Sequence, residues 1–333
     1  MRSIAKLSAQ DREELFSSTA FQTGMSEAII EKDFWVCWML DYLFHHCRWK
    51  NHLAFKGGTS LSKAYDLIQR FSEDIDLILD WQELGYKKDD PWKITSNKKR
   101  DGFCNQIKRN TAIFLRDECL PVMKHDLEQE LGRELDIHVD PNDQQTIVFV
   151  YPQSFRDAAI LQEIRLEIGA LAEWTPVSVQ IIGPYSAQLF PQIFTQSTTS
   201  VLTLDPERTF WEKVVILHMI SNWPVGKRIP DRYSRHYYDL YCMFSSDIKN
   251  KAYADLELLE RVADFKDRFY HSSKAGYDHA KAGTLQLLPS KENEVVLRKD
   301  YENMKEMIYG EKPDFSVILD TIRRLETEIN AFS

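Results

Sequence analysis

The chain has 333 residues, of which 43% are hydrophobic and 28% are charged, and its formal net charge is −9. This length allows one large or two medium domains with their own cores, and the composition is ordinary for a soluble globular protein. The acidic balance argues against an evenly basic nucleic-acid coat, although a local basic patch can still act within an acidic protein.

Cysteine usage and the amino terminus bear on the location. The five cysteines are scattered and form no Cys-x-x-Cys pair, which favours free thiols in a reducing compartment. Residues 1–6 lead into polar, helix-like sequence with no apolar signal core, and no apolar run of about 18 residues follows. We expect a cytoplasmic protein with no membrane partner.

The first part of the chain is expected to place short strands among helices. Helical patterning covers residues 8–47, and 53–55 reads as a strand that stops at Gly57 and Gly58. A helix over 59–69 and a strand over 74–79 should follow.

The stretch 86–145 differs in character, because charged loops precede a helical run over 103–131 and a turn cluster closes it. We interpret it as a helical insertion between two halves of one sheet. Strand patterns then return at 146–151, 160–168, 177–182 and 202–204. From Asp205-Pro206 onward the pattern is helical almost to the end, so the structure type changes near residue 200.

A glycine pair follows the first strand and precedes a predicted helix. Glycine lets the backbone approach a ligand closely, and a helix amino terminus offers N–H groups to phosphate. Thr59 and Ser60 would add hydroxyl donors. Two glycines at a tight turn are the simpler explanation of the same pattern.

Two aspartates open the next predicted strand. Residues i and i+2 of a strand face one side, so Asp74 and Asp76 would project together and suit a divalent cation such as Mg²⁺. Acid-x-acid spacing alone should occur about eight times by chance in a chain this rich in acids. The prediction therefore depends on the order strand, Gly-Gly, helix, Ser-x-Asp-x-Asp.

Two-metal chemistry needs a third carboxylate from a neighbouring strand. The alternating run 162–169 places Glu163, Arg165 and Glu167 on one face. Glu167 is the preferred candidate, Glu163 competes for the same role, and a solvated strand face would look the same.

Six ordered motifs resemble the AbiEii/AbiGii-type nucleotidyltransferase toxin family, within the DNA polymerase beta-like nucleotidyltransferase superfamily. Similarity to the family motifs covers residues 31–36, 56–61, 70–77, 164–170, 206–213 and 235–241, and it extends to 300–304 and 313–315. It spares the stretch from about 86 to 145.

The resemblance implies an α+β fold, with a small mixed sheet flanked by helices. Residues 1–200 would form the nucleotidyltransferase core, and 201–333 a helical domain that closes the cleft. The implied reaction moves a nucleoside monophosphate from a nucleoside triphosphate (NTP) to an acceptor, with two Mg²⁺ ions. The acceptor in some relatives is the 3′ end of tRNA, and such toxins usually have an antitoxin.

The resemblance also implies roles for single residues. Asp74, Asp76 and Glu167 would bind metal, and Lys213 would neutralise the triphosphate. Asp239 would orient Lys213, activate the acceptor hydroxyl, or pair with Arg235. The residues expected around the nucleotide are Lys56, Gly57, Gly58, Thr59, Ser60, Lys63 and Ser72.

Several of these residues have simpler alternatives. Ser72 either bonds the triphosphate or caps a turn, Lys63 either reaches phosphate or faces solvent, and Lys213 could snorkel from an apolar helix. Lys32 and Asp33 are expected to form a structural ion pair, with contact to the site as the alternative.

Two basic clusters are candidates for RNA. One joins residues 98–100 to Lys108 and Arg109, and the other joins Lys227, Arg228, Arg232 and Arg235 to Trp223 and Tyr233. Two alternative functions remain: nucleotide transfer to a protein hydroxyl by the same site, and a non-catalytic binding component of a toxin–antitoxin or phage-defence system.

Overall fold

The computed structural model describes residues 1–72, 74–157, 160–224 and 226–332. The chain divides into two compact units. The first holds Met1–Ala64 and Ser72–Leu204, and the second holds Tyr65–Phe71 with the chain from Asp205 onward. The second unit therefore includes a short piece from early in the sequence.

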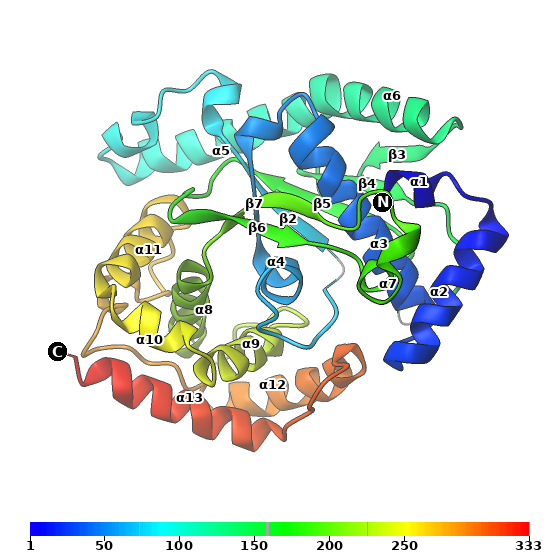
Figure 1. The fold of residues 1–333 in the computed structure, drawn as a ribbon. Helices are drawn as coiled ribbons and strands as arrows, with labels where there is room; N and C mark the ends of the chain where they lie inside the picture. Colours follow the sequence, from blue (N-terminus) through cyan, green and yellow to red (C-terminus); the bar gives the residue numbers. More distant parts are fainter. Residues whose placement is uncertain (73, 158–159, 225, 333) are drawn as a thin grey trace. The chain divides into compact units, whose positions relative to one another are not determined.

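The first unit is built on a seven-stranded mixed sheet with the order β3-β4-β5-β2-β1-β7-β6 (Figure 1). The pairs β5/β2 and β1/β7 are parallel, and the other neighbours are antiparallel. The strands are β1 (Leu53–Lys56), β2 (Asp74–Leu79), β3 (Asp136–Val139), β4 (Thr146–Val150), β5 (Ile164–Gly169), β6 (Val177–Ile182) and β7 (Thr199–Leu204).

Helices flank this sheet, which confirms the α+β expectation. The helices of the first unit are α1 (Arg2–Ala5), α2 (Ala9–Thr23), α3 (Glu27–Asp41), α4 (Gly57–Lys63), α5 (Asn97–Phe114), α6 (Leu120–Leu131) and α7 (Tyr185–Leu189). Helix α3 packs on one face, where Trp35 and Trp38 contact Phe149 of β4 at ring distances of 6.1 and 5.8 Å. Ile75 of β2 and Leu166 of β5 are buried on that same face.

Three consecutive charged residues of α3 are buried and hold three other segments. Glu31 accepts hydrogen bonds from the backbone N–H groups of 154 and 155 at 2.8 to 3.1 Å. Lys32 donates to the Leu161 carbonyl at 2.7 Å, and Asp33 Oδ1 lies 2.5 Å from Lys63 Nζ at the end of α4. The ion partner that the structure gives Asp33 is thus Lys63. Burial raises the pKa of Glu31, and its backbone donors partly oppose that rise.

Several element boundaries differ from the sequence expectation, and one strand was not expected. Helix α4 ends at Lys63 and not near residue 69, because the chain then enters the other unit. Strand β5 begins at Ile164, four residues late. The stretch expected to be a helical insertion also supplies β3, an edge strand that pairs with β4, so it extends the sheet.

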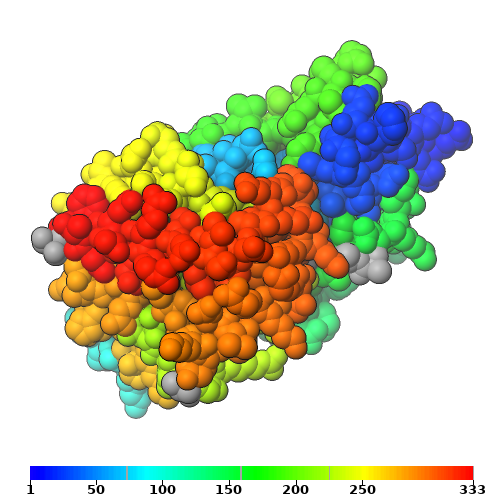
Figure 2. Space-filling view, turned by 90° about the horizontal axis from the view of Figure 1, so that it is seen from below, coloured from blue at the N-terminus to red at the C-terminus, as the bar shows by residue number. Residues whose placement is uncertain are grey.

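The second unit is helical, as expected for the chain after residue 205. Its helices are α8 (Pro206–Ser221), α9 (Ser234–Phe244), α10 (Ile248–Tyr253), α11 (Leu256–Phe269), α12 (Lys291–Met304) and α13 (Phe315–Asn330). In Figure 2 the red helix α13 lies beside the orange stretch that contains α12. Tyr301 of α12 contacts the ring of Phe315 at 5.4 Å and donates to the Pro313 carbonyl at 2.8 Å.

The early segment Tyr65–Phe71 is fixed in the second unit by backbone pairing. Arg70 forms an antiparallel bridge with Ile308, and the N–H of Phe71 donates to the Met307 carbonyl at 2.8 Å. A Cβ on Gly310 would collide with the Gln69 side chain, so these two segments of the chain approach closely there. No helix among the described residues is long and apolar enough to cross a membrane.

Candidate active site

Carboxylates gather on the face of the first unit's sheet that is opposite the α3 core. In the parallel pair β2/β5, Asp76 lies opposite Glu167 and Asp74 lies opposite Arg165. Ile75 and Leu166 are buried on the other face, whereas Asp74 and Asp76 are partly exposed and Glu167 is exposed. The strand register therefore aligns the three acids that the sequence nominated.

Register also separates the two candidates for the third carboxylate. Glu167 is the direct neighbour of Asp76 across the strands. Glu163 precedes β5, and its Oε1 lies 3.2 Å from a guanidinium nitrogen of Arg165. The geometry thus favours Glu167 beside Asp76.

Gly57 makes room for Asp76. Its φ is +81°, a backbone conformation that residues with a Cβ adopt at a cost. A Cβ built there would lie 2.6 Å from Cγ of Asp76 and still closer to its Oδ2. The first glycine and the second aspartate, 19 positions apart, therefore meet at one point, and the glycine is needed for the carboxylate as well as for the turn.

Arg165 is the counter-charge inside this acidic face. Its guanidinium lies 2.5 Å from Asp140 Oδ2 and 3.7 Å from Asp74 Oδ1, in addition to its contact with Glu163. Burial alone would lower the pKa of Arg165, but the bonds to Asp140 and Glu163 outweigh it and raise that pKa. The sequence had placed Asp140 only in a turn cluster, and no local pattern marks it as a partner of β5.

The hydroxyls after the glycine pair make internal hydrogen bonds. Ser60 is fully buried and donates to the Gly57 carbonyl at 2.8 Å, and Thr59 donates to the Asp74 carbonyl. Lys63, held by Asp33, also lies 4.0 Å from the centre of the Tyr185 ring. Thr59 thus ties α4 to β2, Lys63 ties it to α3 and α7, and the bond of Ser60 closes the first turn of α4 itself.

Lys56 and Ser72 are placed differently. Lys56 ends β1 directly across from Asp76, which brings a cation to the row of acids. Ser72 precedes β2 and is partly buried. Gly58 follows Gly57 in the first turn of α4.

The acidic face fits a divalent cation that is completed by its substrate. Like charges directly opposite on neighbouring strands repel, so Asp76 beside Glu167 is favoured when a cation is present. Among the described residues, no three His, Cys, Asp or Glu side chains are grouped so as to hold a metal by themselves. Mg²⁺ commonly takes one or two carboxylates plus phosphate oxygens and water, which suits this arrangement.

A second charged cluster lies within the helical unit. Asp239 of α9 is fully buried and accepts from the Arg70 guanidinium at 2.7 and 2.9 Å and from Lys213 Nζ of α8 at 2.6 Å. Arg235, the partner four residues earlier that the sequence offered, forms no ion pair with it in the described chain. Arg70 and Lys213 therefore both bond the same buried carboxylate.

Burial and the neighbouring charges together set the pKa shifts in this cluster. Burial alone would raise the pKa of Asp239, but Arg70 and Lys213 hold it well below its usual range. Burial lowers the pKa of Lys213, and Arg70 adds to this lowering while Asp239 opposes it. The neighbouring His236 is buried, and burial together with Lys213 lowers its pKa. Its Nδ1 has no hydrogen-bond partner among the described residues.

A family model described as "Nucleotidyl transferase AbiEii toxin, Type IV TA system" matches residues 40–321. This chain belongs to the AbiEii nucleotidyltransferase toxin family. The match covers most of the chain and confirms the resemblance noted in the sequence. The AbiEii chain is therefore a nucleotidyltransferase from a family of type IV toxin–antitoxin systems.

Among solved structures, one that is similar to this AbiEii chain is the MenT4 nucleotidyltransferase toxin from Mycobacterium tuberculosis. The two are 14% identical with a TM-score of 0.45, over 95% of this chain and 98% of that one. A search of curated proteins found no match.

Proposed function

We propose that this protein transfers a nucleoside monophosphate from an NTP to RNA, most specifically to the 3′ end of tRNA, in a metal-dependent reaction. The observation that carries the proposal is the strand register that sets Asp76 beside Glu167, with Asp74 two residues away on the same face. Phosphoryl transfer requires charge neutralisation and positioning more than covalent chemistry from the protein, and this face can supply both.

Asp74, Asp76 and Glu167 are the proposed ligands of Mg²⁺, and two ions are expected. When bound, the metal would polarise the α-phosphate and lower the pKa of the attacking hydroxyl. The acceptor hydroxyl forms the new bond to the α-phosphorus, the bond to the β-phosphate oxygen breaks, and pyrophosphate leaves. The hydroxyl proton passes to solvent.

The remaining proposed roles concern the triphosphate. We propose that the backbone at Gly57 and Gly58 and the hydroxyl of Ser72 seat it, with Lys56 nearby. Thr59, Ser60 and Lys63 would act by holding α4 in place, because each already has an internal partner. Lys213 is the proposed cation for the triphosphate, and Asp239 the residue that orients it.

The proposal of RNA binding is supported by aromatic and cationic side chains of the helical unit, and the proposal of a protein partner is supported by the family. Lys227 Nζ lies 3.6 Å from the centre of the Trp223 ring, and Tyr233 lies 6.1 Å from that ring. Cations beside aromatic rings suit contact with single-stranded RNA. Membership of a type IV toxin–antitoxin family supports a cognate antitoxin, which we expect the neighbouring gene to encode.

The test is incubation of the purified chain with each α-labelled NTP, Mg²⁺ and total tRNA, followed by separation of RNA from protein. Label is expected in RNA, and Asp76→Asn should reduce it by about a thousandfold while circular dichroism and melting stay those of the wild type. Label in a protein band would identify protein as the acceptor. A folded wild type that labels neither, and shows no metal-dependent NTP binding by calorimetry, would leave a non-catalytic binding role.

A further inference from the structure

A cavity of about 390 Å³ lies in the first unit, apart from the carboxylate row. Three segments line it: the turn after β2, the loop that leads into the insertion, and the loop between β5 and β6. Its size is that of a small-ligand site. None of the residues proposed to bind metal or nucleotide lines it.

The cavity lies on the same sheet face as the acids, farther along the strands. Trp174 lines it and packs against a small apolar cluster that includes Ile78 of β2. Ile78 is two residues after Asp76 and so faces the same side. From Asp76 to Asp80 at the cavity the chain advances about 13 Å, at roughly 3.3 Å per residue.

Three tryptophans give the cavity its chemistry. Trp81, Trp92 and Trp174 all line it, and Trp92 is 38% exposed, so an indole surface is available to a ligand. Trp81 is only 6% exposed, and its Nε1 donor has no acceptor among the described residues. Indole faces stack nucleobases of any kind, and an unpaired N–H can bond a base carbonyl.

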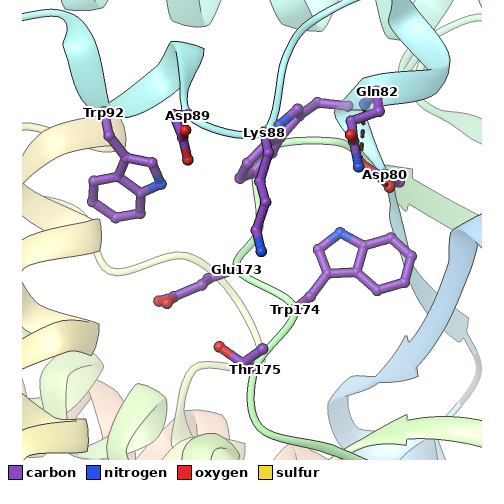
Figure 3. Close-up of a pocket in the computed structure, with 9 residues that line it drawn as sticks. Asp80, Gln82, Lys88, Asp89, Trp92, Glu173, Trp174 and Thr175 are labelled. Atoms are coloured by element: carbon purple, nitrogen blue, oxygen red, sulfur yellow. Dashed lines mark hydrogen bonds between the residues drawn. The ribbon is translucent and has the colours of Figure 1, made fainter.

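Charged groups complete the lining. Figure 3 shows the Lys88 side chain extended between Trp92 and Trp174, with its ammonium near Glu173. Lys88 is the one cation among the described residues of a lining that also holds the carboxylates of Asp80, Asp89 and Glu173, and its ammonium can pair with a phosphate next to a bound base. The carboxylates of Glu173 and Asp89 can accept hydrogen bonds from an exocyclic amino group.

The chain next to the cavity is basic. Lys98, Lys99 and Arg100 open α5 just after the segment that holds Lys88 and Trp92, and both lysines are exposed. A track of cations beside stacked aromatic rings is the usual arrangement for single-stranded nucleic acid. The basic cluster noted in the sequence thus lies near Trp92 along the chain.

We propose that this cavity holds one unpaired nucleobase of the acceptor RNA, stacked on Trp92 and Trp174, and that its carboxylates favour bases with an amino group over uracil. The proposal rests on RNA being the acceptor. The neighbouring phosphate would face Lys88, and the base would sit away from the reacting end of the strand.

Binding separates this proposal from the transfer reaction. Fluorescently labelled oligo(rC), oligo(rA) and oligo(rU) are titrated into the full-length Asp76→Asn chain without NTP. Oligo(rC) and oligo(rA) should bind more tightly than oligo(rU). Adding Trp92→Ala should raise the Kd for them about tenfold, and Lys88→Ala should also weaken binding. Glu173→Gln should bring the Kd for oligo(rU) closer to the Kd values for oligo(rC) and oligo(rA), because an amide can also donate a hydrogen bond to uracil.

Two matched controls define the baseline. Phe21→Ala removes an aromatic side chain that is 90% exposed on α2, and Lys87→Ala removes the lysine next to Lys88 that does not line the cavity. Neither should change the Kd.

Unchanged RNA affinity in both Trp92→Ala and Lys88→Ala overturns the proposal, even if the wild type labels tRNA. Loss of binding to an arginine-rich peptide in Trp92→Ala, with RNA binding intact, overturns it in favour of a peptide site. Failure of the wild type to label RNA counts against the proposed function alone, because the cavity is judged by binding.

Discussion

The acidic face of the first unit and the Arg70–Asp239–Lys213 cluster of the second solve opposite electrostatic problems. On the sheet, Asp76 and Glu167 face each other with access to solvent, and Lys56 lies across from Asp76 on the other neighbouring strand. In the helical unit, Asp239 is fully buried and is compensated entirely by side chains. The first region is the proposed site for a bound cation, whereas the second already contains its own counter-charges.

The difference teaches what substitution should do in each place. Removing a charge from the open face should change function and leave stability nearly unaltered, because solvent screens the remaining groups. Removing a charge from the buried cluster should unfold the protein more easily, because its partners lose their compensation in a medium of low dielectric constant.

The largest effect is expected on the open face. Glu167→Gln should lower the rate of nucleotide transfer by about a hundredfold or more, because it removes a proposed metal ligand beside Asp76. Steady-state rates with saturating NTP and RNA measure this. Glu163→Gln is the matched control on the same segment, and its rate of nucleotide transfer should fall far less. If Glu163→Gln is the more damaging of the two, the assignment of the third carboxylate is reversed.

Asp239→Asn should destabilise the chain by about 3 to 5 kcal/mol, because Arg70 and Lys213 would stay buried without their carboxylate. Urea unfolding at neutral pH measures the loss. Asp320→Asn, which breaks an exposed pair with Arg323, is the control and should leave the midpoint unchanged. A midpoint for Asp239→Asn equal to that of the wild type would show that the cluster is not an internal source of stability.

The same comparison has a pH dependence. The folded pKa of Asp239 is held below the ordinary value of 3.8 by Arg70 and Lys213, against the opposing effect of burial. The unfolded chain therefore binds this proton more readily, and the contribution of Asp239 to stability is complete above about pH 4. It is lost as the pH falls below that value. The stability gap between wild type and Asp239→Asn should narrow there, and a gap that widens toward acid would contradict the assignment.

The smallest effect concerns the meeting of Gly57 and Asp76. Gly57→Ala should cost about 1 to 2 kcal/mol for the positive φ, and the displaced carboxylate should lower transfer as well. Gly24→Ala is the matched control, because Gly24 has a φ of +72° and no atom within 4 Å of its missing Cβ. Melting curves and rates for the two variants separate backbone strain from collision. Equal losses of rate would exclude a role for the contact.

Much of the open face was predictable from local pattern. Alternation placed Asp74 and Asp76 on one side of β2, and the same rule put Glu167 on the matching side of β5. Both strands were expected within a few residues, because period-two patterning is visible in a short window. The sequence could not show that Gly57 touches Asp76, since that depends on the turn geometry of a folded chain.

The buried cluster was not predictable in the same way. Arg70 and Asp239 are 169 positions apart, and no spacing rule joins them. The sequence offered Arg235 because residues four apart on a helix are neighbours, but a long-range partner was chosen by packing. The predicted helix over 59–69 failed for a related reason, because Asp66 has a φ of +50° and residues 69–71 pair with residues 307–310 instead of continuing the helix.

The route of Tyr65–Phe71 limits how this protein can be divided or shuffled. The boundary between the two units is crossed three times by the chain, after Ala64, Phe71 and Leu204. Ile68 and Arg70 are buried in the whole protein. A truncation at residue 204 would remove the part of the chain that covers them and would expose both side chains. Each unit consists of two separate stretches of the sequence, so a single cut in the chain cannot separate one complete unit from the other. A fragment that ends at residue 204 and keeps the whole first unit, with Asp74 and Asp76, also carries Tyr65–Phe71, which belongs to the helical unit.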